Sequence, residues 1–275
     1  MGTIETKAFV MNSFPWKDRH RLLHLLTPEL GLITALAPAS ESLRSRLRGV
    51  TQLFSLSDFT LSSQQSRYTV KDGSVIESFV AVSQDLDRLA AASHAAEVFS
   101  DVARNDEPQR RIYDLWAYTI HEISVADDPV FIARMGTMRL MEEIGVAPCL
   151  EVCVCCRGAI DEPWRFNFRE GGLVCRMEMS RYEKEASITL SRGAVDLLRH
   201  IMKASLPKLY RFQAASEIRA EVSCLADRWI EDKMEKRYNR LSLLDQCPDF
   251  LIPKRHVSEQ QTLPDEQGSP GENGL

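Results

Sequence analysis

Residues 51–80 read TQLFSLSDFTLSSQQSRYTVKDGSVIESFV, and this stretch indicates the fold class of the N-terminal part. Its first half alternates with the period of a β-strand, so that one face carries Leu53, Ser55, Ser57, Phe59 and Leu61. Its second half contains Asp72-Gly73, a strong signal for a two-residue hairpin turn, between runs rich in β-forming residues. We therefore predict a strand within residues 51–63 and a hairpin centred on Asp72-Gly73.

Three further apolar runs precede this stretch. They read ETKAFVMNSF (5–14), RLLHLLTPE (21–29) and GLITALA (31–37), and Pro28 and Gly31 separate the last two. Five or six short strands in about 75 residues favour a small barrel, because a two-sheet sandwich usually has more strands. We predict a barrel over residues 1–80.

The apolar pattern takes a helical spacing after Ser83. One stripe consists of Leu86, Leu89, Ala92, Ala96 and Phe99, and a second of Ile112, Leu115, Trp116, Thr119 and Ile123. A third helix begins at Asp128-Pro129, because Asp is a good N-cap and Pro fits the first helical position, and Gly145 is its expected stop. Residues 81–147 are therefore predicted to form a helical bundle.

The C-terminal part divides into helices and a tail. Ser191 and Ser216 are predicted N-caps of two more helices, which place residues 181–244 with the helical domain. Residues 245–275 are rich in Pro, Gly, Gln and acids, and we predict a disordered acidic tail. The overall fold class is α+β.

Charge is distributed unevenly. The net charge is −5, yet residues 1–50 carry seven Lys/Arg against four acids, and residues 245–275 carry six acids against two bases. The N-terminal module is thus locally basic and suited to phosphates. No run of about 18 apolar residues exists and the N-terminus lacks a secretory pattern, so we expect a cytoplasmic protein whose seven cysteines are thiols or metal ligands.

Residues 148–178 read PCLEVCVCCRGAIDEPWRFNFREGGLVCRME and resemble a zinc knuckle. Structural zinc takes four ligands, and the candidates are Cys153, Cys156 and Cys175, with Cys149 or Glu178 as the fourth. Alternatively, free thiols pack inside a small knuckle held by Trp164, Phe166, Phe168 and Leu173. A redox pair is a third reading, although the βαβ pattern around such pairs is missing.

Basic and aromatic residues of the N-terminal module form the candidate nucleic-acid site. Arg44, Arg46 and Arg48 alternate, so in an extended segment they would share one face and follow a phosphate backbone. Lys17, Arg19 and Arg21 would extend this patch, and Trp16 is the best candidate for stacking on bases. The alternative is a solvated loop. Phe9, Phe54, Phe59 and Phe79 are expected in the core.

Catalytic motifs are missing from the sequence. The six histidines form no metal-ligand spacing, and there is no Gly-x-Ser-x-Gly, phosphate loop or GxGxxG. We therefore expect no enzyme. The remaining candidates are a DNA-binding mediator and a protein-interaction module with little direct DNA binding.

The order of segments resembles the bacterial recombination mediator and DNA repair family RecO, from about Glu5 to Leu244. The resemblance rests on TKAFVMNSFPWKDRHRLLHLLTPELGLITALA, SRLRGVTQLFSLSDFTL, LDRLAAASHAAEVFSDV, RRIYDLWAYTIHEI, RLMEEIGVAP and CVCCRGAIDEPWRFNFREGGLVC. It implies an N-terminal OB-fold barrel and a helical domain with a zinc-finger-like insertion at residues 148–180.

The resemblance also implies a function in the RecF pathway. The family binds single- and double-stranded DNA, anneals strands, and works with RecR to load RecA onto DNA coated by the single-strand-binding protein SSB. Arg46, Arg48 and Gly49 match its arginine-glycine segment, whereas APASES replaces the basic residues that often precede it. Arg139, with Arg134 nearby, matches a position that could meet the acidic SSB tail. Cys153, Cys156 and Cys175 match three zinc-ligand positions, and Glu178 occupies the fourth.

Overall fold

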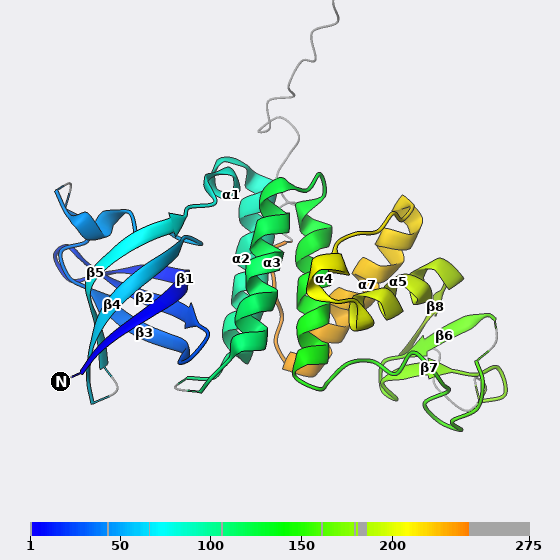
Figure 1. Cartoon of the computed structure of the whole chain (residues 1–275). Helices are drawn as coiled ribbons and strands as arrows, with labels where there is room; N and C mark the ends of the chain where they lie inside the picture. Colours follow the sequence, from blue (N-terminus) through cyan, green and yellow to red (C-terminus); the bar gives the residue numbers. More distant parts are fainter. Residues whose placement is uncertain are drawn as a thin grey trace, which may run out of the picture.

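The computed structural model describes residues 2–42, 44–65, 67–105, 107–160, 162–178, 180 and 186–241. The predicted acidic tail, residues 245–275, lies outside the described residues. In Figure 1 a five-stranded sheet stands at one end, long helices occupy the middle, and a small sheet stands at the other end. The observed fold class is α+β, as predicted.

The N-terminal sheet consists of β1 (Gly2–Trp16), β2 (His20–Thr27), β3 (Gly31–Ala37), β4 (Leu56–Gln64) and β5 (Arg67–Glu77). Its strands pair in the closed order β1-β2-β3-β5-β4, with β4 returning to β1. All pairs are antiparallel except β3 with β5. The interior is apolar and includes Ala8, Val10, Leu23, Leu25, Ile33, Phe59 and Leu61.

The predicted hairpin at Asp72-Gly73 is wrong. Both residues lie inside β5, opposite Thr60 and Phe59 of β4. A Cβ atom at Gly73 would lie 2.9 Å from the carbonyl oxygen of Asp58. Because it has no side chain, Gly73 allows β4 and β5 to approach closely beside a register shift. A close approach of backbones is a common reason for Gly inside a strand.

The start of β4 also differs from the prediction, since the strand begins at Leu56 rather than near residue 51. Residues 51–55 form turns in which Phe54 has a φ of 65° and donates its N–H to the carbonyl of Val10. The turns leave Leu53 42% exposed and Phe54 buried, so these two residues do not continue the face of the strand.

The helices are α1 (Val80–Gln84), α2 (Leu86–Val102), α3 (Arg110–Val125), α4 (Pro129–Glu143), α5 (Arg192–Lys203), α6 (Leu206–Leu209) and α7 (Ser216–Met234). Asp128 and Ser191 cap α4 and α5 with side-chain hydrogen bonds, as predicted. Gly145 follows α4 with a φ of 78°. Ser216 is the first helical residue rather than the cap, a position that Ala215 takes.

The second sheet has the order β7-β6-β8, formed by β7 (Gly172–Val174), β6 (Trp164–Asn167) and β8 (Ser187–Leu190). One apolar core joins the helices to both sheets: Phe9 and Leu26 enter it from the closed sheet, and Phe166 and Leu173 from the second. Among the described residues, no helix has the length and apolar character that crossing a membrane requires.

Candidate nucleic-acid interface and cysteine cluster

Two basic segments that are distant in sequence meet at one end of the closed sheet. The turn after β1 contains Lys17 and Arg19, and the connection after β3 leads to Arg44. The backbone N–H of Glu41 donates to the carbonyl of Arg19 at 3.2 Å. The N–H of Ala39 donates to Nδ1 of His20 at 2.9 Å. These contacts hold both segments against the same edge.

The three arginines after β3 are exposed but not extended. Arg46–Arg48 form a short 3-10 helix, η1, whose N-cap Ser45 accepts a hydrogen bond from the N–H of Leu47. Leu47 is buried, which leaves Arg46 and Arg48 in solvent on either side of it. The predicted extended geometry is therefore wrong, and the three arginine residues are exposed.

Arg21 differs from its neighbours because its charge is already compensated. It donates to the side chain and the carbonyl of Ser13 at 2.7 and 2.9 Å and forms a 3.0 Å ion pair with Glu41. Its side chain is 28% exposed. Arg21 therefore ties β1 and β2 to the connection after β3, and it contributes less net charge than Lys17 or Arg19.

Two aromatic side chains project beside these cations. Trp16 and Phe14, at alternate positions of β1, are 47% and 41% exposed. The Phe14 ring lies edge-on to His24 at a centroid distance of 5.3 Å. Phe14 was not among the predicted stacking residues, although its position two residues before Trp16 places it on the same face of the strand. Phe9, Phe54 and Phe59 are buried, as predicted, and Phe79 is half-buried against the core that contains Phe9 and Phe54.

A groove of about 770 Å³ runs from this edge toward the helices. Arg21, Glu41 and Arg48 are the charged residues that line it, and Leu53, Val80 and Leu89 are among its apolar lining. Val80 is 50% exposed. The groove therefore combines a cationic wall with accessible apolar surface.

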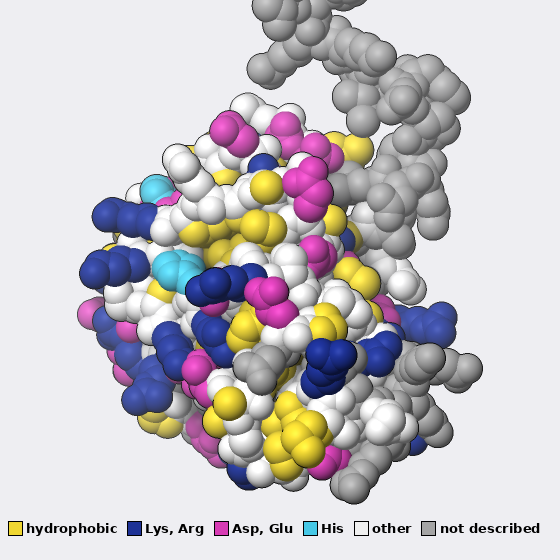
Figure 2. Space-filling model, turned by 90° about the vertical axis from the view of Figure 1, so that its right-hand side faces the viewer, with side chains coloured by type: hydrophobic (Ala, Val, Ile, Leu, Met, Phe, Trp, Pro, Cys, Tyr) yellow, Lys and Arg dark blue, Asp and Glu magenta, His cyan; other side chains and the backbone are white. Residues whose placement is uncertain are grey.

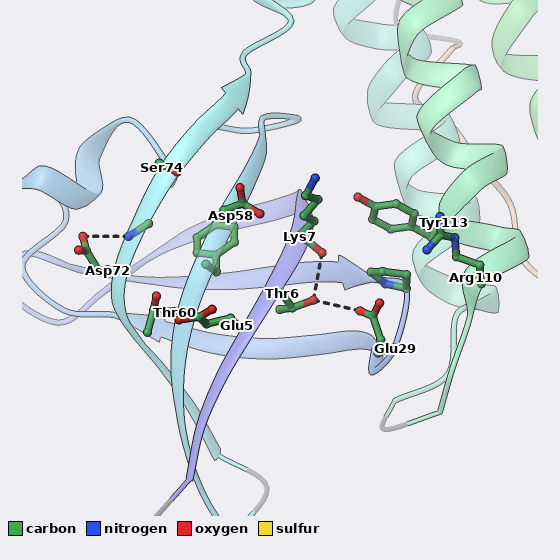
Figure 3. Close-up of a pocket in the computed structure, with 13 residues that line it drawn as sticks. Glu5, Thr6, Lys7, Glu29, Asp58, Thr60, Asp72, Ser74, Arg110 and Tyr113 are labelled. Atoms are coloured by element: carbon green, nitrogen blue, oxygen red, sulfur yellow. Dashed lines mark hydrogen bonds between the residues drawn. The ribbon is translucent and has the colours of Figure 1, made fainter.

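The surface between the closed sheet and α3 is acidic. A groove of about 710 Å³ there is lined by four carboxylates, Glu5, Glu29, Asp58 and Asp72, with the cations Lys7 and Arg110 (Figure 3). Thr6 donates its hydroxyl to Glu29 at 3.2 Å. Burial raises the pKa of Tyr113 beside them to about 12. Phosphates are disfavoured at this face, so the sheet has one basic edge and one acidic side.

Arg134 and Arg139, the two candidates for docking a partner's acidic tail, both have partners within the chain. Arg134 makes a two-pronged contact with Asp227 at 2.8 and 2.9 Å. Arg139 donates to the carbonyls of Met202 and Ala204 at the end of α5 and to Glu143. Their side chains are 21% and 14% exposed. Both arginines therefore join helices.

One face of the C-terminal half presents a mixed surface. Figure 2 shows Lys and Arg side chains scattered over this face with Asp and Glu between them. A surface with interspersed charges of both signs attracts a phosphate backbone less strongly than the basic edge of the closed sheet does.

Cys153, Cys156 and Cys175 form a cluster in which all three sulfur atoms lie within 4.8 Å of one another. Sγ of Cys156 and Sγ of Cys175 are 3.7 Å apart. Tetrahedral zinc with bonds of about 2.3 Å would place two thiolates about 3.8 Å apart. The three thiols therefore fit three of the four ligand positions of a structural zinc site.

Backbone groups of the knuckle stabilise a thiolate. Burial raises the pKa of Cys153, but the N–H groups of Cys156, Cys175 and Cys155 outweigh it and lower this pKa to about 7. The Gly158 N–H lowers the pKa of Cys156, yet the adjacent thiols of Cys153 and Cys175 shift it upward overall. A thiolate at Cys153 beside two further thiols is an arrangement that a cation would complete.

The proposed fourth ligands are not part of this group. The Cys149 thiol lies 3.5 Å from the carbonyl oxygen of Val152, and the residue forms a β-bridge with Gly172. Among the described residues, neither Cys149 nor Glu178 joins the three clustered thiols. Phe166, Phe168 and Leu173 are buried behind the knuckle, so apolar packing and a three-thiol cluster coexist.

Comparison with known proteins identifies the family. Residues 1–79 match the model of the recombination protein O N-terminal domain, and residues 83–242 match that of the recombination protein O C-terminal domain. The chain belongs to the RecO family. The boundary between the two matches falls between the closed sheet and α2, where β-structure gives way to helices.

Curated RecO relatives cover most of the chain. A protein of Acetivibrio thermocellus named DNA repair protein RecO is 26% identical over 89% of this chain and 97% of its own length. A protein of the same name from Alkaliphilus metalliredigens is 31% identical over 62% of this chain and 70% of its own length. RecO membership gives the chain a role in DNA repair and recombination and implies DNA and recombination-pathway proteins as its partners.

Proposed function

We propose that the chain is a non-enzymatic mediator that binds single- and double-stranded DNA at the basic edge of the closed sheet, which we interpret as an OB-fold barrel. The observation that carries this proposal is the meeting of two distant basic segments beside Phe14 and Trp16. The domain division that follows is a barrel at 1–80, helices at 81–147 and 181–244, and a knuckle at 148–180.

Binding would depend on phosphates and stacking rather than on base edges. Lys17, Arg19, Arg44, Arg46 and Arg48 are exposed, and cations that track a backbone provide sequence-independent, salt-sensitive affinity. Exposed aromatic rings add stacking that tolerates any base. The acidic groove beside α3 would keep the strand on the basic edge.

Annealing follows from the same surface, because two strands approach each other more easily when their charges are partly neutralised. Family membership supports the further steps, in which the protein works with RecR to help load RecA onto SSB-coated DNA. If the SSB tail docks at Arg134 and Arg139, its carboxylates must displace Asp227 and Glu143, which these arginines contact now.

A structural zinc ion is the proposed cofactor. Cys153, Cys156 and Cys175 would hold it, and the ion would fix the knuckle that packs on α7 through Phe166 and Trp229, whose ring centroids are 5.6 Å apart. This role is architectural, since the knuckle lies at the far end of the molecule from the closed sheet (Figure 1).

Fluorescence anisotropy with labelled oligonucleotides tests the DNA site. At low salt, replacing Arg44, Arg46 and Arg48 with alanine should weaken binding by at least about tenfold. The matched control removes three exposed arginines of the C-terminal half, Arg176, Arg192 and Arg211, and should change affinity far less. Phe14→Ala and Trp16→Ala should each weaken single-strand binding by about 1 kcal/mol or more.

The opposite outcome would favour the second candidate function. If the wild-type chain binds RecR or an SSB-tail peptide but no DNA, it is an interaction module. Equal losses in the two triple-arginine variants would likewise remove the basic edge as the DNA site.

A further inference from the structure

The segment after α7 is clamped along α2. Glu235 ends α7 with a φ of 50°, and the chain then turns back. Lys236 forms ion pairs with Asp101 and Glu97 at 2.7 and 2.9 Å, and Arg240 pairs with Glu97 at 2.6 Å. Because Lys236 contacts Asp101 and Arg240 contacts only the earlier Glu97, this segment runs antiparallel to α2.

Arg240 of the clamped segment lies close to the groove beside the closed sheet. The N-terminal end of α2 carries Leu89, which lines the 770 Å³ groove with Leu53 and Arg48. Arg240 itself lines a neighbouring hollow of about 290 Å³, and Leu53 borders both. From Glu97 to Leu86 the helix rises about 16 Å. Arg240 therefore lies one hollow away from the groove, and the last described residue, Leu241, is buried beside His94 of the same helix.

The groove contains exposed apolar side chains and an arginine without an ion pair among the described residues. Leu53 and Val80 are 42% and 50% exposed within it. A docked apolar segment would remove the exposed area of both side chains from water. At its cationic wall Arg21 is paired with Glu41, whereas Arg48 forms no ion pair with any of the described residues. A matching ligand would carry apolar side chains and at least one carboxylate.

The remaining chain contains such a segment. Residues 249–253 read DFLIP: one carboxylate followed by three large apolar residues and a proline. Asp249 is eight residues beyond Leu241, a separation that spans up to about 26 Å and exceeds the distance along α2. The segment lies beyond residue 242, where the match to the family's C-terminal model ends.

We propose that Asp249–Pro253 folds back into this groove. Phe250, Leu251 and Ile252 cover the exposed apolar surface, and Asp249 pairs with Arg48. Because Arg48 belongs to the basic edge, the docked segment competes with DNA there, a consequence that rests on the proposed DNA-binding function. The docking itself does not depend on it.

Hydrogen exchange of the full chain, read by mass spectrometry, tests the docking directly. Amides of residues 249–252 should exchange at least about tenfold more slowly than those of an unstructured chain. Replacing Phe250, Leu251 and Ile252 together with serine should abolish this protection and speed exchange in residues 80–84. The matched control, Val257→Ser with Leu263→Ser, should change neither region. Exchange at the unstructured rate in the wild-type chain would overturn the proposal.

A second readout separates docking from DNA competition. The triple serine variant should bind a labelled single-stranded oligonucleotide at least about threefold more tightly than wild type at low salt. Asp249→Asn should raise this affinity more than Asp265→Asn does. If wild type and the triple serine variant bind the oligonucleotide equally, while residues 249–252 of wild type are protected from exchange, the competition is overturned and the docking stands. If no variant binds DNA, the proposed function fails while the exchange result still decides the docking.

Discussion

Gly31 is a residue whose side chain, a single hydrogen, decides how the closed sheet meets the helices. Its φ is 65°, and a Cβ atom there would lie 2.1 Å from the carbonyl oxygen of Arg104. The neighbouring N–H of Leu32 donates to that same carbonyl at 3.1 Å. Any side chain at this position would push the sheet away from the connection between α2 and α3.

Gly31→Ala should lower the free energy of unfolding by about 3 kcal/mol, because the left-handed backbone and the steric clash add. Gly145→Ala is the matched control: its φ is 78°, yet nothing lies within 4 Å of the added Cβ, so only about 1 kcal/mol should be lost. Urea unfolding measures both. Equal losses would show that Gly31 matters for its backbone conformation alone.

His94 makes stability depend on pH. Burial is the main cause that lowers its pKa from 6.5 to about 4, and neither ring nitrogen has a hydrogen-bond partner among the described residues. Asp227, Arg134, Glu97 and Arg240 act on it with smaller, opposing effects. As pH falls below 6.5 the unfolded chain takes up a proton that the folded chain does not bind, so the folded state loses stability.

The loss should reach about 3 kcal/mol between pH 6.5 and pH 4. His94→Leu should flatten the pH dependence of the unfolding free energy in this window, while the acid loss below pH 4 from carboxylates such as Glu97 persists. Urea unfolding at several pH values measures it. A variant with the same slope as wild type would contradict the assignment to His94.

Predictions from single residues were correct where the residue interacts only with the backbone next to it in sequence. Asp128 and Ser191 cap helices, because a cap needs only the backbone that follows it. Asp72-Gly73 failed as a turn, because the same pair also suits a close approach of strands, and only the register against β4 distinguishes the two uses.

At the scale of elements, helix positions followed from apolar periodicity, whereas the contacts between helices did not. The spacing from Leu86 to Phe99 predicted α2, and that helix is observed. No local pattern shows that Arg139 of α4 would bind the carbonyls at the end of α5, some sixty positions later. The arginines therefore looked available for a partner until their tertiary contacts were known.

The cysteine knuckle gives a prediction about metal. One zinc ion per chain should copurify, and Cys156→Ser should remove it, because three clustered thiols are the ligands that the structure brings together. Cys149→Ser should leave zinc content unchanged, since that thiol lies outside the cluster. Elemental analysis of the purified variants measures this. Zinc lost with Cys149 and kept without Cys156 would reverse the assignment.

For the molecule as a whole, the sequence predicted the α+β class, the change from strands to helices near residue 80 and a basic N-terminal module. It could not predict that the module is polarised. The acidic groove of Glu5, Glu29, Asp58 and Asp72 assembles from four separate segments, and the basic edge joins two turns through backbone hydrogen bonds. The net charge of the module shows neither the acidic groove nor the basic edge.

The salt dependence of single-strand binding shows whether DNA contacts the basic edge of the closed sheet. If Lys17, Arg19, Arg44, Arg46 and Arg48 all contact phosphates, log K should fall with log salt at a slope of about −3.5, since each cation contributes about 0.7. Arg44/Arg46/Arg48→Ala should reduce this slope by about 2. An unchanged slope in the triple variant would show that DNA binds elsewhere on the molecule.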